Sequence, residues 1–405
     1  MSGEEGARRR DVALIATLCV AEIASMSAIA TFPALLPTFI DEWQLTHVAA
    51  GWISSLYFAG YLTAVLILVS LTDSIDPRRI YLFCMLLSLG ATAGFALFAQ
   101  GFWTASALRV AGGIALAGTY MPGLKILSDR IAGQTQARAV SFYTASFGIG
   151  SSASYYLAGQ VAAWRDWHWA FGVAAIGPLL ATLLVWRRVA PSPQARAGGG
   201  GLRLRDFLDV LRNRSAMGYI LAYAAHNWEL FGMRAWIVAY LTFARGLHPA
   251  SWALAAPPTL AALVNLMGLP ASVGGNELSI RCGRQRVISA VMGASALLAA
   301  AVGFLPWLPG SAVAAMCLVY GLTVAGDSAS LTSGAIAEAR PDKRGTTMAV
   351  HSAIGFLGAF CGPLAVGAAL DVAGGAGGPS WGAGFLTMGA GAAVGPLLML
   401  AFARR

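Results

Sequence analysis

Eight ionisable side chains lie within long apolar stretches of this 405-residue chain. An ionisable group at the centre of a bilayer costs about 2.5–3.5 kcal/mol on insertion scales, so each is a candidate functional group. In such a setting carboxyl and imidazole groups could carry protons, and guanidinium groups could attract an anion. The eight residues are Glu22, Arg109, Lys125, His226, Glu229, Arg234, Asp327 and His351.

Glu22 and Glu229 are candidate proton carriers, because a carboxyl group removed from water holds a proton more readily. They are 207 positions apart, one in each half of the chain. His226 lies three residues before Glu229, so the two side chains share a helix face and form a candidate proton relay. The alternative for Glu22 is a buried ion pair with Arg109 that only holds two helices together.

Arg109, Arg234, Trp228 and Asp327 are candidate substrate-binding residues. Arg234 is about 7.5 Å further along its helix than Glu229, at 1.5 Å per residue. It could attract an anionic substrate or simply neutralise Asp327 or Glu229. Trp228 would form an apolar wall of the binding site, and Asp327 a polar one.

Composition indicates which elements must position these residues. Hydrophobic residues make up 57% of the chain and charged residues only 11%, whereas soluble domains have about 25% charged residues. A membrane-spanning helix needs about 20 apolar residues. Twelve segments satisfy that length and predict an all-α membrane protein: 12–38, 47–70, 79–100, 103–126, 139–163, 167–188, 216–243, 252–274, 286–306, 310–335, 345–370 and 381–402.

Charge and motif content exclude several classes of function. Most of the 27 basic residues fall in loops that share one side if the N-terminus is cytoplasmic, so the net charge of +9 reflects topology and not nucleic-acid binding. We expect an integral protein of the bacterial inner membrane with both termini cytoplasmic. The five scattered cysteines form no CxxC pair, so we expect no metal and no cofactor. No nucleophile–base motif occurs, and we expect no enzyme.

The chain divides into two related halves. Residues 189–215 are the one long polar connection between apolar segments. Within them, the run Gly198–Gly201 is typical of a flexible linker. The stretch that follows has leucines spaced as on one face of a helix. The expected domains are 1–188, a cytoplasmic linker 189–215 with an amphipathic helix, and 216–405. Arg78 and Arg284 are 206 positions apart, which favours an internal duplication into two six-helix bundles.

The basic loops resemble the signature loops of the major facilitator superfamily. The loop after the second segment carries Leu71, Asp73, Arg78 and Arg79, although Val69 stands where the family has glycine. The second-half copy retains Arg281, Gly283, Arg284 and Arg286. The resemblance implies that Asp73, Arg78, Arg79, Arg281 and Arg284 form a gating loop that biases inward-open against outward-open states.

Two further stretches carry the resemblance. Arg109-x-x-Gly112-Gly113 looks like the buried-arginine motif of the family, and Gly358-x-x-x-Gly362-Pro363 resembles its Gly-x-x-x-Gly-Pro motif. Within the superfamily, residues 119–125 and 226–236 are most similar to the nitrate, cyanate and nitroimidazole-type anion carriers. The resemblance implies a rocker-switch carrier with helices one, four, seven and ten lining its cavity.

We therefore expect a monomeric secondary transporter in the lipid bilayer that moves a small polar solute by alternating access with the proton as coupling ion. An anion is one candidate for this solute. One alternative is drug or metabolite efflux by proton antiport, which a wide aromatic cavity without arginine would favour. The alternative from another class is a non-transporting receptor or scaffold. Ionisable groups within the membrane argue against it, because a scaffold has no use for them.

Overall fold

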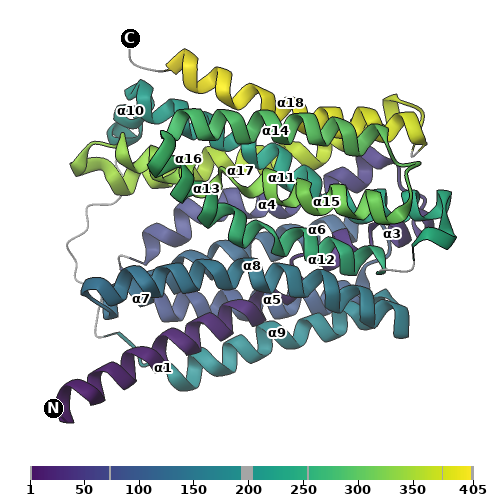
Figure 1. Cartoon of the computed structure of the whole chain (residues 1–405). Helices are drawn as coiled ribbons and strands as arrows, with labels where there is room; N and C mark the ends of the chain where they lie inside the picture. The colour runs from purple at the N-terminus through teal and green to yellow at the C-terminus, as the bar shows by residue number, and fades with distance from the viewer. Residues whose placement is uncertain (1, 73, 193–203, 253–254, 376, 403–405) are drawn as a thin grey trace. The chain divides into compact units, whose positions relative to one another are not determined.

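Every regular element of the described chain is a helix (Figure 1). The computed structural model describes residues 2–72, 74–192, 204–252, 255–375 and 377–402. The helices form two compact units, one comprising Met1–Phe32 with Gly60–Gly201 and the other Pro33–Ala59 with Leu202–Arg405. Residues 33–59 thus group with the second half of the chain, and α4 (His47–Leu71) contributes to both units.

The first unit buries an apolar cluster around Leu18, Tyr81, Leu127 and Val185. These residues come from four different helices, so the cluster joins the unit across long sequence distances. The helices of this unit, apart from its share of α4 and of α2 (Thr31–Ala34), are α1 (Ser2–Ser25), η1 (Met26–Ala28), α5 (Pro77–Phe98), α6 (Phe102–Ala117), α7 (Tyr120–Arg130), α8 (Gly133–Trp164) and α9 (Trp167–Arg188).

The second unit has an equivalent cluster that includes Ile220, Met292, Leu331 and Met399. Beside its part of α4, the unit contains α3 (Leu36–Glu42), α10 (Leu204–Arg212), α11 (Arg214–Leu247), η2 (Pro249–Ser251), α12 (Pro257–Leu266), α13 (Gly268–Cys282), α14 (Arg284–Phe304), α15 (Gly310–Ala325), α16 (Ser328–Ala337), η3 (Pro341–Lys343), α17 (Arg344–Val372) and α18 (Gly378–Phe402). In α10, Val210 is buried in this cluster whereas Leu208 and Leu211 are exposed, which suits a helix at a membrane surface.

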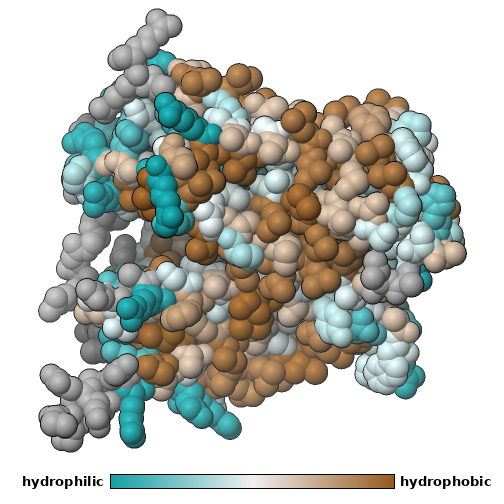
Figure 2. Space-filling model, in the orientation of Figure 1, coloured by the Kyte–Doolittle hydropathy of each residue, from teal (hydrophilic) through white to brown (hydrophobic). Residues whose placement is uncertain are grey.

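Nine helical stretches of the described chain are long and apolar enough to cross a membrane. Figure 2 shows that apolar side chains cover the flanks of the helices on the face in view, while hydrophilic ones gather near their ends. The stretches are Arg9–Ala28, His47–Leu71, Pro77–Phe98, Phe102–Arg130, Trp167–Arg188, Arg284–Phe304, Gly310–Ala337, Pro341–Val372 and Gly378–Phe402. They coincide with nine of the twelve expected segments.

The other three expected segments are helical as well, which is consistent with twelve spans. Segments 139–163 and 216–243 lie within α8 and α11, two long helices that are richer in polar residues. Segment 252–274 is instead two helices, α12 and α13, which meet at Met267 and continue to Cys282. The all-α fold predicted from the apolar segments is therefore confirmed.

Besides segment 252–274, and segment 12–38 in which α1 ends at Ser25, two more expected spans are interrupted, each near its middle. Gly118 and Thr119 separate α6 from α7, and Gly326 and Asp327 separate α15 from α16. At both breaks the backbone tightens to a three-residue turn: Gly118 N–H donates to Ala115 O at 3.1 Å, and Gly326 N–H to Thr323 O at 3.2 Å. Broken helices in transporters leave polar backbone only where protein or water can satisfy it.

The Gly358-x-x-x-Gly362 motif lets α17 approach α11 closely. A Cβ atom added to Gly358 would lie 2.0 Å from Ala224 O, and one added to Gly362 would lie 2.2 Å from Trp228 O. Any larger side chain would therefore force the two backbones apart, as in other small-residue helix interfaces in membranes. This interface fixes the position of α11, which carries several candidate site residues.

Candidate functional site

Glu22 lies in the interior of the first unit, with none of its surface exposed. Its Oε2 accepts a hydrogen bond from Tyr143 Oη at 2.9 Å, and Ser25 Oγ donates to the Glu22 backbone carbonyl at 2.8 Å. The side-chain partners of Glu22 are thus neutral hydroxyl groups, that of Tyr143 from α8 and, at 3.5 Å, that of Ser25. A carboxyl in this environment can exist either as a hydrogen-bonded carboxylate or as a neutral acid.

Arg109 is also buried in the first unit, with 6% of its surface exposed. Its Cζ lies 5.7 Å from the centroid of the Phe32 ring, within the range of a cation–π interaction. The sequence placed both Glu22 and Arg109 within the membrane, and their burial agrees with that placement. Neither side chain is directed at lipid.

In the second unit, His226 and Asp327 form a buried pair. His226 Nδ1 lies 2.8 Å from Asp327 Oδ1, and each side chain is at most 3% exposed. His226 comes from the middle of α11, whereas Asp327 occupies the break between α15 and α16. The helix break therefore brings a carboxylate to an imidazole 101 positions away in the sequence.

Aromatic stacking extends this pair toward α17. The Tyr223 ring stacks on His351 with centroids 4.0 Å apart, and on His226 with centroids 5.6 Å apart. His351 Nε2 lies 3.2 Å from Thr332 Oγ1. Two histidines, a tyrosine and an aspartate thus form one continuous polar cluster inside the unit, which we call the His226 cluster.

Glu229 belongs to a separate polar contact on the same helix. Its Oε1 accepts hydrogen bonds from Ser295 Oγ at 2.8 Å and from Tyr320 Oη at 3.1 Å. His226 thus contacts Asp327 at the break between α15 and α16, and Glu229 is hydrogen-bonded to α14 and α15; the relay between His226 and Glu229 stays a prediction. The spacing of residues along one helix does not predict these partners, because they come from the neighbouring helices.

Arg234 and Trp228, two further candidate binding residues of α11, contact different neighbours. Arg234 Nε donates to Asn265 Oδ1 at 2.8 Å, and its Cζ lies 5.2 Å from the Phe231 ring centroid. Trp228 Nε1 donates to the Thr387 carbonyl of α18 at 3.0 Å. The indole of Trp228 is thus directed at a neighbouring helix of its own unit, which favours a packing role over a substrate wall.

The contacts described for the expected gating loops lie within their own units, and their role in gating stays a prediction. Asp73 lies outside the described residues. In the same loop, the side chain of Asp76 caps α5 by accepting a hydrogen bond from Arg78 N at 3.0 Å. It also accepts one from Ser192 N at 3.0 Å. Arg78 Nη2 donates to Trp186 O at 2.7 Å, at the end of α9. These contacts tie the start of α5 to the chain after α9.

The basic side chains of the second loop are mostly solvated. Arg281 pairs with Glu277 one turn earlier at 2.7 Å, with both side chains more than half exposed. Arg284 is half-buried at the start of α14, and Arg79 is exposed. An exposed pair of this kind contributes little stability.

The hydroxyl and amide partners of these residues were not predicted from the sequence. Tyr143, Ser295, Tyr320 and Asn265 each donate to or accept from a candidate site residue. Serine, tyrosine and asparagine occur widely in membrane helices, so their type alone carried no signal. Asp76 could have been found, because Asp-Pro is a strong helix-start signal.

Comparison with known proteins assigns the family. The model of the Major Facilitator Superfamily matches residues 18–337. Among curated proteins, the mouse sphingosine-1-phosphate transporter SPNS2 is 26% identical over 219 residues, 52% of this chain and 40% of the relative. The niacin transporter NiaP of Acinetobacter baylyi (strain ATCC 33305 / BD413 / ADP1) is 23% identical over 158 residues, 39% of this chain and 36% of the relative. The matches thus span less than half the length of these relatives.

Solved structures show the same fold. A bacterial homologue of the human lysosomal transporter Spinster, inward-facing and unoccupied, has a TM-score of 0.76 at 14% identity, covering 97% of this chain and 95% of that one. The nucleoside transporter NupG has a TM-score of 0.76 at 13% identity, covering 97% and 98%. These relatives are transporters and not enzymes. Since the family model matches most of its length, this chain belongs to the Major Facilitator Superfamily.

Proposed function

We propose that this protein is a proton-coupled secondary transporter that moves a small polar solute, preferably an anion, by alternating access. The observation that carries the proposal is the burial of titratable side chains in membrane helices with hydroxyl or imidazole partners. Glu22, Glu229, His226 and Asp327 are each at most 2% exposed. Protein interiors exclude such groups unless they are paired or functional.

An anionic solute is supported by the arginines. Arg234 is partly exposed beside Asn265, and the planar fork of a guanidinium suits carboxylate and phosphate groups. One curated relative is named for a phosphate-bearing lipid, sphingosine-1-phosphate. The resemblance of residues 119–125 and 226–236 to nitrate, cyanate and nitroimidazole-type carriers points to the same class of solute. We place the protein as a monomer in a bacterial inner membrane, with both termini cytoplasmic.

Efflux of drugs or metabolites by antiport is the less favoured function. A wide aromatic binding site without arginine would support it, whereas Arg109 and Arg234 lie within membrane helices here. Trp228, the expected aromatic wall, contacts α18. A scaffold role is opposed by the His226 cluster, because a scaffold does not require buried titratable pairs.

Replacing Glu229 by Gln is expected to abolish pH-driven accumulation while solute exchange continues, because Gln retains the hydrogen bonds but cannot carry a proton. The solute is first chosen by thermal-shift screening of small anions, amino acids and sugars. Uptake into proteoliposomes under a pH gradient is expected to fall by about tenfold or more. A tenfold effect lies within the range that a typical coupling free energy produces. Glu22→Gln tests the first unit in the same assay.

The matched control is Glu277→Gln, which changes an exposed acid of the same unit. It is expected to accumulate the solute as the unaltered protein does. Normal coupling in both Glu22→Gln and Glu229→Gln would show that these residues do not carry the coupling proton.

Arg234→Gln is expected to remove stabilisation by anions, because the guanidinium supplies the charge that attracts them. A ligand at 100 times its Kd stabilises a protein by about 2.7 kcal/mol, which a thermal unfolding series with inorganic and carboxylate anions can measure. Arg245→Gln, an exposed site on the same helix α11, is the control. Equal stabilisation of Arg234→Gln and the unaltered protein would assign the anion site elsewhere.

A further inference from the structure

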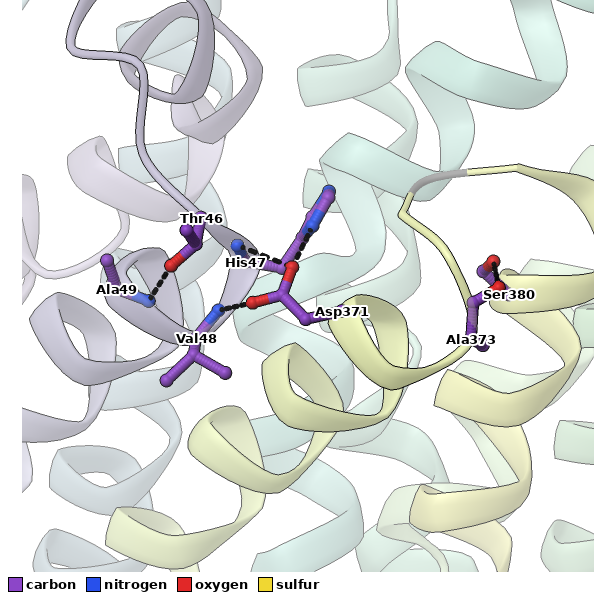
Figure 3. A network of polar contacts seen from close by, with 7 residues as sticks. All are labelled: Thr46, His47, Val48, Ala49, Asp371, Ala373 and Ser380. Carbon is purple, nitrogen blue, oxygen red and sulfur yellow. Dashed lines mark hydrogen bonds and ion pairs between the residues drawn. The ribbon is translucent and has the colours of Figure 1, made fainter.

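Asp371 holds the amino end of α4 (Figure 3). Its Oδ1 lies 2.6 Å from His47 Nδ1 and accepts from His47 N at 3.1 Å. Its Oδ2 accepts from Val48 N at 2.8 Å. One carboxylate therefore satisfies two backbone donors of the first turn of α4 and contacts an imidazole, an arrangement that helix-end electrostatics favours.

This contact lies far from the basic loops. Helix α4 begins at His47 and ends at Leu71, so about 36 Å of helix separate it from the loop of Asp76 and Arg78. Asp371 is one residue from the end of α17, which begins at Arg344. The distance approximates the thickness of a bilayer, so the contact belongs to the side of the membrane opposite the basic loops.

A cavity of about 340 Å³ places His47 in reach of solution. Trp236 and Trp381 form apolar walls, and Asp41 of α3 lines the cavity with His47. Asp371 of α17 and Asp41 are thus the charged groups that face the imidazole, while α11 and α18 present tryptophan rings. The side chain of His47 is 15% exposed and that of Asp371 29%, so protons can reach the pair.

We propose that His47 and Asp371 form a pH-sensitive latch that fastens α4 to α17 and tightens in acid. A protonated imidazole adds a charge–charge attraction to the backbone hydrogen bonds, whereas a neutral imidazole leaves only hydrogen bonds. The charge–charge attraction exists only while the imidazole is protonated, so the latch loosens as the pH on this side of the membrane rises. Loosening exposes the surface of α4 that the contact covers.

Labelling of a buried cysteine in the first turns of α4 tests the proposal. Ala50, in the first turns of α4, is fully buried, and Ala50→Cys is treated with a methanethiosulfonate reagent in lipid nanodiscs. Rates are measured by peptide mass spectrometry and divided by those of exposed Ala250→Cys, which removes the pH dependence of the thiol itself. Labelling is expected to be about fivefold slower at about pH 5.5 than at about pH 8, the effect of one partly exposed ion pair.

Variants of the two partners distinguish the latch from other pH effects. In the Ala50→Cys background, Asp371→Asn is expected to label fast at both pH values, His47→Gln to lose the pH response, and Asp371→Glu to regain part of it. His168→Gln, which removes an exposed histidine 3.5 Å from Asp166, is expected to leave the response intact. An unchanged rate between the two pH values, or a full response in Asp371→Asn, would overturn the proposal. The solute need not be known, so this result is independent of the proposed function.

Discussion

Asp327→Ala is expected to lower the free energy of unfolding by about 3–5 kcal/mol, because it leaves His226 buried without its charged partner. The two side chains are 2.8 Å apart and almost wholly inaccessible to solvent. A lost carboxylate cannot be replaced by water at this depth. Denaturant titration in lipid–detergent micelles, followed by tryptophan fluorescence, measures the change.

A double-mutant cycle identifies the source of the loss. His226→Leu together with Asp327→Leu removes both polar partners, so the double variant is expected to be more stable than the single Asp327→Leu. The interaction energy of the cycle is expected to be about 1–3 kcal/mol. Additive effects of the two single variants would show that the pair is not coupled. Asp342→Ala, which breaks an exposed contact with Arg340, is the control and is expected to change stability by about 0.5 kcal/mol or less.

Gly362→Val is expected to prevent stable packing of α17 on α11. A Cβ at this position would lie 2.2 Å from Trp228 O, and a backbone atom cannot rotate away as a side chain can. Overpacking of this kind costs about 1–3 kcal/mol or more, and valine adds two methyl groups beyond the Cβ. A thermal unfolding curve is expected to show a large fall in Tm, with a smaller fall for Gly362→Ala.

The same helix offers a matched control. Gly345, in the first turn of α17, has open space where a Cβ would go. Gly345→Ala is expected to be neutral or to stabilise the helix by up to about 1 kcal/mol, the difference in helix propensity. If Gly345→Ala and Gly362→Ala shifted Tm alike, the close approach of α11 and α17 would not be what Gly362 permits.

Hydropathy is a local property, and six of the eight ionisable residues in the apolar segments are buried. The exceptions are Arg234, which is partly exposed, and Lys125, whose side chain is 34% exposed. An apolar stretch long enough to span the bilayer defines the environment of every residue within it. Glu22, Arg109 and Glu229 were therefore placed in the membrane without knowledge of the helix packing. Their exposed fractions, at most 6%, agree with that placement.

Pairing could not be predicted, because it depends on the neighbours of each helix. Glu22 meets Tyr143 across 121 positions, and His226 meets Asp327 across 101. No periodicity of one segment encodes which residue of another segment it will face. The His47–Asp371 contact was missed for a further reason: both residues lie at helix ends, where hydropathy predicts only a loop boundary.

The helix breaks were missed because the apolar runs continue through them. Segments 103–126 and 310–335 were expected as single helices, yet Gly118 and Gly326 interrupt them. Glycine in an apolar run costs helix propensity but does not by itself stop a helix. Position in the duplication was the available signal, since comparison of the two halves aligns the glycines.

The two breaks occupy similar places in the two halves of the chain. Thr119 and Asp327 are 208 positions apart, close to the 206 that relates Arg78 to Arg284. Only the second break carries an acidic residue, and its carboxyl group lies against an imidazole of α11. The interruption between α6 and α7 is thus a plain bend, whereas the one between α15 and α16 also delivers a polar group to the interior of the protein.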